Sequence, residues 1–130
     1  MKYILTDNYG KEKEENDISV LNDFLNQPFE YWQEGTGDSS ISIKKDEMII
    51  FFKVESGVFL MQHPDYLAPL IDNENDGEIT HYVGGQEMII PKKFIISDVE
   101  TSFKILKRYI NEGLFSNKYE WKDIYEEEIK

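Results

Sequence analysis

Between residues 40 and 96, the chain repeatedly joins short segments rich in Ile, Val, Phe and Tyr through residues that favour turns. Segments of this kind predict β-strands, and short connections such as Gly84-Gly85 predict hairpins. The predicted strands cover residues 40–44, 47–54, 58–62, 79–83 and 87–90, with 94–96 as a candidate extension. Because a hairpin pairs neighbouring strands in opposite directions, this pattern predicts an antiparallel sheet.

A first helix is predicted before these strands. Asp17 can accept hydrogen bonds from the free amides of a helix start, and Pro28 ends the helical pattern. The apolar residues at helical spacing between them are Val20, Leu21, Phe24 and Leu25. Further upstream, residues 2–6 predict a short strand and the polar residues 8–16 predict a loop.

A second helix is predicted over residues 98–112. Ser97 and Glu100 have the spacing of a capping box, and Gly113 offers the left-handed conformation that ends many helices. The residues expected to form its buried stripe are Val99, Phe103, Leu106 and Ile110. Trp121 follows this helix, and we expect it to pack near the helix end as a structural residue.

These elements predict an α+β fold, with an antiparallel five- to six-stranded sheet and two helices packed on one face. The length of 130 residues corresponds to one domain, residues 1–130. A hydrophobic content of 40% supports a globular core, and the absence of Cys excludes disulfides and thiolate chemistry.

The charge of the chain excludes some partners. Its 26 acidic and 14 basic residues give a net charge of −12, which repels nucleic acid and anionic membrane surfaces. No apolar run approaches the roughly 18 residues of a membrane span, and the N-terminus has no apolar signal region. We therefore expect a cytoplasmic protein whose partner is basic.

The acidic residues concentrate in one window, because no Lys or Arg occurs from residue 54 to residue 91. Tyr side chains beside acids suit an interface, since each supplies apolar area and a polar tip. The candidate partner-binding residues are Tyr66, Asp72, Glu74, Asp76, Glu78 and Tyr82. The alternative interpretation of this window is a solvated acidic loop.

Two other functions can be read from the residues. Residues 72–79 match part of an EF-hand calcium loop, with Gly77 at the bend, but its twelfth position is Val83 instead of Glu. An enzyme could use His63 or His81 with a nearby acid, although neither has a partner at catalytic spacing. The sequence predicts no catalytic residue, metal site or cofactor.

The C-terminal half carries one further pattern, a glycine hairpin, a strand with a proline, a helix ending in glycine, and then a tryptophan. The residues in these places are Gly84, Gly85, Pro91, Gly113 and Trp121. Over roughly residues 57–125, this order resembles the first-numbered immunity-protein family of bacterial polymorphic toxin systems. The resemblance implies a cytoplasmic protein that binds a cognate toxin domain and occludes its active site, without catalysis of its own.

Overall fold

The computed structural model describes residues 2–113, 115 and 118–124. Its largest element is a seven-stranded antiparallel sheet in the order β2-β1-β3-β4-β5-β6-β9. The strands are β1 (Tyr3–Thr6), β2 (Glu12–Glu15), β3 (Ser39–Lys44), β4 (Glu47–Val54), β5 (Gly57–His63), β6 (Leu67–Pro69) and β9 (Trp121–Asp123). The predicted α+β class is confirmed, although the sheet has more strands than the five or six expected.

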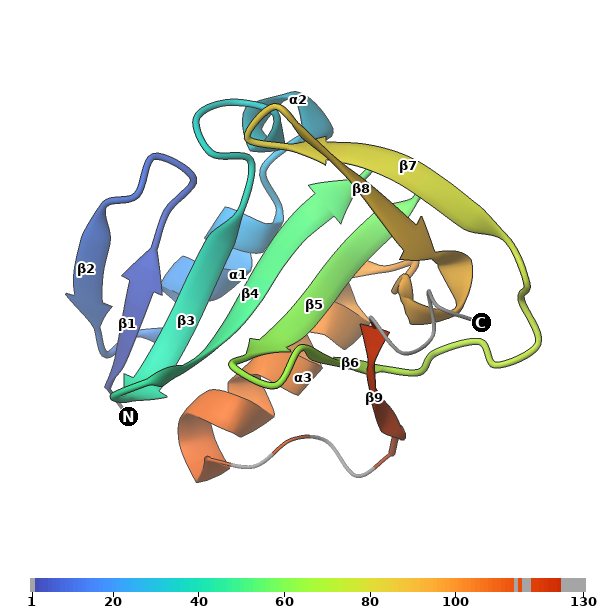
Figure 1. Cartoon of the computed structure of the whole chain (residues 1–130). Coiled ribbons are helices and arrows are strands. Elements are labelled where there is room, and N and C mark those ends of the chain that lie inside the picture. The colour runs from blue at the N-terminus through green and yellow to red at the C-terminus, as the bar shows by residue number, and fades with distance from the viewer. Residues whose placement is uncertain (1, 114, 116–117, 125–130) are drawn as a thin grey trace.

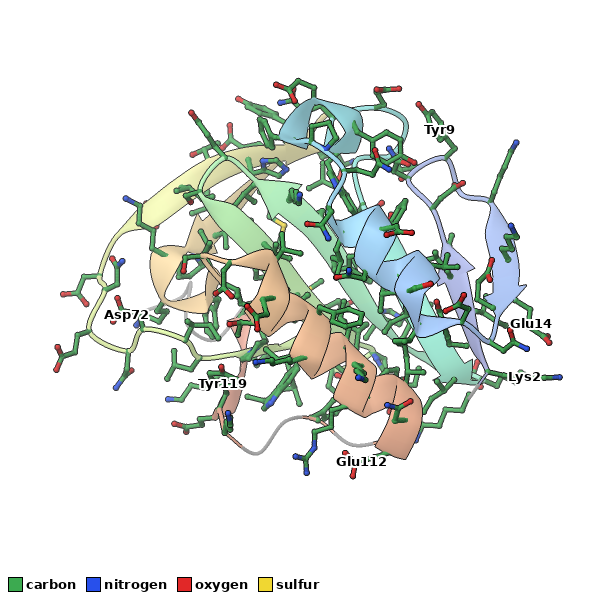
Figure 2. The ribbon with its side chains drawn as sticks, turned by 180° about the vertical axis from the view of Figure 1, so that it is seen from behind. Lys2, Tyr9, Glu14, Asp72, Glu112 and Tyr119 are labelled. Carbon is green, nitrogen blue, oxygen red and sulfur yellow. The ribbon has the colours of Figure 1, made fainter. Side chains whose placement is uncertain are left out.

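Two helices, α1 (Ile18–Leu25) and α3 (Val99–Glu112), cover one face of this sheet, as Figures 1 and 2 show. The predicted pair of helices on one face is therefore confirmed. A single turn, α2 (Phe29–Trp32), follows α1. Among the side chains that the two helices and this sheet face bury are Tyr3, Leu21, Leu25, Ile41, Phe51, Leu60 and Leu106.

The hairpin of β7 (Glu78–Val83) and β8 (Gln86–Pro91) forms a sheet of its own, which corrects the prediction of a single sheet. Figure 1 shows it crossing the upper part of the face opposite the helices. There Phe52 and Phe59 form a cross-strand pair, and the His81 ring stacks on Phe52 with ring centroids 5.2 Å apart. Because β4 and β5 carry apolar residues on both faces, the sheet needs this second cover.

Two predicted loop or strand assignments are wrong. Residues 8–16 are not all loop, because β2 pairs with β1 and forms one edge of the sheet. Its charged sequence hides it from a search for apolar strands, and charges suit an exposed edge. Residues 94–96 do not extend a sheet, since a 3₁₀ turn covers Lys92–Phe94 and Ile96 makes only an isolated bridge with Val58.

The predicted N-cap of the first helix is confirmed, and the predicted N-cap of the second helix is wrong. Asp17 caps α1 as expected, because its Oδ1 accepts a hydrogen bond from the Ser19 amide at 2.9 Å. Asp98, not Ser97, caps α3, and its Oδ2 accepts from the Thr101 amide at 2.9 Å. Gly113 ends α3 with a φ of 68°, as predicted.

The buried face of α3 differs from the predicted stripe. Leu106 and Ile110 are buried, whereas Val99 and Phe103 are only partly buried. The residues buried on α3 are Ser102, Ile105, Leu106, Tyr109 and Ile110. Ser102 and Tyr109 carry polar groups that the structure satisfies, so hydrophobicity alone does not identify them.

Candidate partner-binding surface

The β7–β8 hairpin has one face turned away from the sheet. Thr80 pairs with Ile89 and Tyr82 pairs with Glu87 across the two strands, so these side chains share a face. We call Glu78, Thr80, Tyr82, Glu87 and Ile89 the outer hairpin face. Tyr82 is 62% exposed and Ile89 is 38% exposed, and the Tyr82 hydroxyl donates a 3.4 Å hydrogen bond to Oε2 of Glu87.

The acidic loop that leads into β7 is held by backbone hydrogen bonds. The Ile71 and Asp72 amides donate to the Lys93 carbonyl at 2.7 and 3.0 Å, and the Lys92 amide donates to the Gly77 carbonyl at 2.9 Å. The loop is thus tied at both ends to the chain that follows the hairpin. Its acidic side chains Asp72, Glu74 and Asp76 are exposed.

The structure brings basic residues to this loop that the sequence window does not contain. A Cβ atom at Gly77 would lie 2.9 Å from Cδ of Lys92, so the Lys92 side chain runs directly past the loop. Lys93 provides the carbonyl that holds the other end. The cation at Lys92 therefore weakens the negative electrostatic potential of the acidic loop. The potential is less negative than expected from the absence of Lys and Arg between residues 54 and 91.

Tyr66 lies apart from the rest of the predicted partner-binding set. It occupies the turn between β5 and β6, where its ring contacts the His63 ring at 5.8 Å. Figure 1 places this turn at the opposite end of the sheet from the tip of the β7–β8 hairpin. The structure therefore brings together Asp72, Glu74, Asp76, Glu78 and Tyr82 on one continuous segment, without Tyr66.

Thr80, Glu87 and Ile89 were not among the predicted partner-binding residues. The signal for them is present in the sequence, because alternate residues of a strand lie on one face. The Gly84-Gly85 turn then fixes which residues of the return strand join that face. Thr80 shares the face of Tyr82 because it lies two residues away, and Glu87 and Ile89 are the cross-strand partners of Tyr82 and Thr80.

The loop at residues 72–79 shows hydrogen bonding of a turn. Asp72 Oδ1 accepts from the Glu74 amide at 3.3 Å, and Asn75 Oδ1 accepts from the Gly77 amide at 3.0 Å. The first of these Asx-type bonds engages Asp72, which holds the first ligand position of an EF-hand loop, whereas Asn75 holds the fourth position, which supplies no ligand. Within residues 2–113, 115 and 118–124, no group of three His, Cys, Asp or Glu residues could hold a metal ion.

His81 packs the hairpin against the sheet. It is 9% exposed, and its ring lies parallel to that of Phe52 with an interplanar angle of 7°. Phe29 of α2 lies on another side, at a ring-centroid distance of 6.3 Å. Burial lowers the pKa of His81 because it disfavours the charged imidazolium.

We expect this burial to make the stability of the protein depend on pH. The unfolded chain binds a proton at His81 near pH 6.5, whereas the folded protein resists it, so the free energy of unfolding falls as the pH drops below 6.5. The loss is about 1.4 kcal/mol for each unit by which the pKa is lowered. Urea unfolding between pH 5 and 8 measures it, and His81→Phe should flatten the curve.

The matched control is His63→Gln, which changes the other histidine but not the hairpin packing. Glu55 and Lys92 line the same groove as His81 and are present in the parent and in both variants, so any effect they have on the curves is common to all three. The difference between the His81→Phe and parent curves removes that common part. An unchanged slope in His81→Phe would show that His81 does not couple folding to pH.

Three residues of the predicted family pattern have clear structural roles. Gly84 and Gly85 form the hairpin turn with φ values of 57° and 82°, a region that favours glycine. Pro91 ends β8 and precedes the 3₁₀ turn. These roles follow from the fold alone.

Trp121 lies in β9, where it pairs with Pro69 of β6. Its ring is 4.9 Å from that of Phe115, which stacks on Tyr109 at 5.8 Å. This aromatic row links β9 to the last turns of α3. Trp121 therefore packs near the helix end, as predicted.

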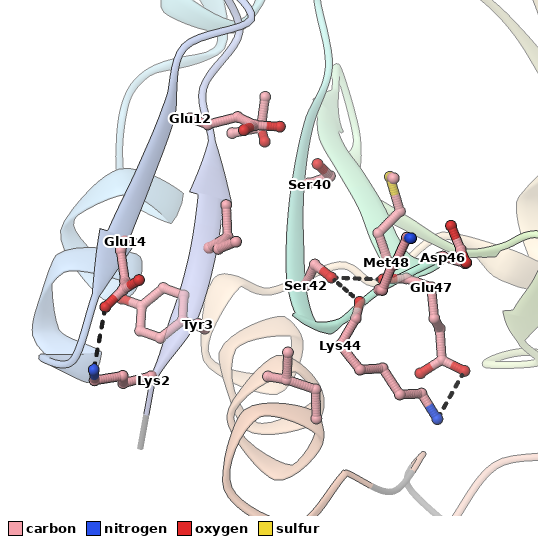
Figure 3. Close-up of a pocket in the computed structure, with 14 residues that line it drawn as sticks. Lys2, Tyr3, Glu12, Glu14, Ser40, Ser42, Lys44, Asp46, Glu47 and Met48 are labelled. Carbon is pink, nitrogen blue, oxygen red and sulfur yellow. Dashed lines mark hydrogen bonds and ion pairs between the residues drawn. The ribbon is translucent and has the colours of Figure 1, made fainter.

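A separate cavity of about 470 Å³ lies on the part of the sheet that the hairpin leaves uncovered (Figure 3). Its floor is formed by Ile4, Thr6, Ser40 and Met48. Lys2 pairs with Glu14 at 3.4 Å and Lys44 pairs with Glu47 at 3.5 Å, so much of its charged rim is neutralised. This arrangement is that of a solvated antiparallel sheet face.

No model of a known protein family matches the chain, and no curated protein gives a significant match. Among the helices of the described residues, none is both long and apolar enough to cross a membrane. The surface chemistry of the outer hairpin face and the acidic loop therefore carries the functional argument.

Proposed function

We propose that this protein neutralises a cognate bacterial toxin domain by binding it and covering its active site. The observation that carries the proposal is the outer hairpin face together with the acidic loop. Exposed carboxylates at Asp72, Glu74, Asp76 and Glu78 there lead directly to the exposed ring of Tyr82. An aromatic anchor beside acidic groups suits a basic protein surface.

The electrostatics favour a toxin whose active site is basic, as in a domain that acts on nucleic acid. Such a site attracts an acidic cover at long range, which accelerates association and rejects uncharged competitors. The net charge of −12 extends this attraction over the whole molecule. The resemblance to an immunity-protein family supports the same function, with a cytoplasmic location and no catalysis by this chain.

The proposal is tested by neutralising the acidic loop. A variant with Asp72→Asn, Glu74→Gln, Asp76→Asn and Glu78→Gln should fold normally, because exposed charges add little stability. Its association with the cognate toxin domain, to be sought in the neighbouring reading frames, should slow about tenfold or more at low salt and lose most of its salt dependence. Stopped-flow measurements at low and physiological salt give both quantities.

The matched control removes the same charge from elsewhere. Glu12, Glu14, Asp23 and Glu112 are also exposed acids, and Figure 2 shows Glu14 on the opposite side of the molecule from Asp72. The control variant neutralises these four instead. Equal association rates for the two variants would mean that only the net charge matters and that the acidic loop is not the interface.

A further inference from the structure

The turn of the β7–β8 hairpin determines which backbone groups bond within it. Gly84 and Gly85 form a two-residue connection with positive φ at both positions, as in a type I′ turn. In such a hairpin, the residues that flank the turn exchange both backbone hydrogen bonds. Val83 and Gln86 occupy these places. Hydrogen-bonded and non-hydrogen-bonded pairs then alternate along the strands.

This alternation leaves one edge of β7 unpaired. Thr80 and Tyr82 belong to non-hydrogen-bonded pairs, so their backbone N–H and C=O groups point away from β8. No residue in the described part of the chain bonds to these groups. His81 lies between them and bonds toward β8. The free edge therefore presents two donors and two acceptors at the spacing of a strand.

The free edge faces a groove of about 490 Å³. The groove is lined by Ile79, Thr80, His81 and Tyr82 of β7, by Phe29 and Gln33 near α2, by Glu55 and Ser56 of the β4–β5 turn, and by Lys92. Figure 1 shows the hairpin passing beside α2 and this turn. Apolar rings thus lie beside the free backbone groups.

We propose that this groove binds an extended, basic segment of a protein partner as an added strand on β7. Strand addition satisfies the free backbone groups of Thr80 and Tyr82, and alternate side chains of the segment enter the groove beside Phe29. Carboxylates at Glu55 and Glu78 flank the edge, against one cation at Lys92. The same carboxylates disfavour pairing with a second copy, because like charges would meet across the new ladder.

Only the identity of the partner, a toxin domain, rests on the proposed function. Strand addition itself can be tested without that partner. The probe is an acetylated and amidated peptide, Val-Lys-Val-Lys-Val, and the readout is amide hydrogen exchange followed by NMR. At millimolar peptide, exchange at the Thr80 and Tyr82 amides should slow at least tenfold. The His81 amide, already bonded to β8, should not change and serves as the internal reference.

Backbone recognition is isolated by two matched pairs. Thr80→Pro removes the outward N–H without breaking a bond to β8 and should abolish peptide binding, whereas Thr80→Val retains the N–H and should bind. The peptide can also be N-methylated at its valines or at its lysines. Only one of these two sets of amides can face β7, so one methylated peptide should fail and the other should bind. This second pair stays informative if Thr80→Pro does not fold.

Three results would overturn the proposal. One is the absence of protection at Thr80 and Tyr82 with the lysine peptide. Another is equal protection by Val-Glu-Val-Glu-Val, which would show that binding does not require a basic segment. The third is protection that rises with protein concentration without peptide, which would make a second copy the occupant.

The toxin domain separates this proposal from the proposed function. If the lysine peptide binds but the toxin domain does not, strand addition stands and the proposed function fails. If the toxin domain binds Thr80→Pro as tightly as Thr80→Val, the proposed function stands and strand addition fails.

Discussion

Replacing Tyr109 by Ala is expected to lower the free energy of unfolding by about 4 kcal/mol. Tyr109 is fully buried in α3, and its hydroxyl donates a 3.0 Å hydrogen bond to Oε1 of Glu47 at the start of β4. Burial first, and this bond second, raise the pKa of Tyr109. The substitution removes a large buried ring and the hydrogen bond to Oε1 of Glu47, while the ion pair between Lys44 and Oε2 of Glu47 remains.

Two further variants separate these contributions in urea unfolding. Tyr109→Phe keeps the ring and should cost about 1–2 kcal/mol through the lost hydrogen bond. Phe103→Ala changes a ring on the same helix that is only partly buried, so it should cost about 1–2 kcal/mol. A Tyr109→Ala loss no larger than that of Phe103→Ala would mean that the core of α3 is not centred on Tyr109.

Gly35→Ala should destabilise the protein by about 3 kcal/mol or more. Gly35 has a φ of 63°, and a Cβ atom there would lie 2.0 Å from the carbonyl oxygen of Asn8. That carbonyl accepts from the Thr36 amide and hydroxyl, while the buried Asn8 side chain donates to the Tyr31 and Glu34 carbonyls. The new methyl group must therefore separate the β1–β2 connection from the loop after α2.

Gly10→Ala is the matched control for this prediction. Gly10 also has a positive φ, of 80°, but no atom lies within 4 Å of the position that its Cβ would take. Its cost should be the left-handed backbone penalty alone, about 1–2 kcal/mol. Thermal unfolding of both variants gives the difference, and equal melting temperatures would show that the Asn8 contact yields without cost.

Local patterns in the sequence predict the elements better than their assembly. The hairpin at Gly84-Gly85, the strand pair of β4 and β5, and the start of α1 at Asp17 all follow from neighbouring residues. The packing of the β7–β8 hairpin on the seven-stranded sheet does not follow from neighbouring residues. It depends on the contact between His81 and Phe52, which lie far apart in sequence. The charged strand β2 also could not be predicted from its own residues, because its pairing with β1 determines its conformation.

The candidate surface shows the same division. The acids from Asp72 to Glu78 and the ring of Tyr82 could be identified from composition and spacing. The position of Tyr66 could not, because nearness in sequence does not place two turns side by side. Lys92 approaches the acidic loop because Glu78 pairs with Pro91 across the hairpin, which places Lys92 beside Gly77. A charge count along the sequence does not register this pairing.

The backbone bonds from Ile71 and Asp72 to Lys93 close the base of the hairpin excursion. The chain leaves the framework and re-enters it at two points that are fixed to each other, whatever lies between. Residues of the outer hairpin face can thus change in identity while His81 keeps the hairpin packed on Phe52 and the register of the seven-stranded sheet stays the same. The architecture separates a constant scaffold from a variable outer hairpin face. Under the proposed function, new partner specificities would arise by changing the outer hairpin face alone.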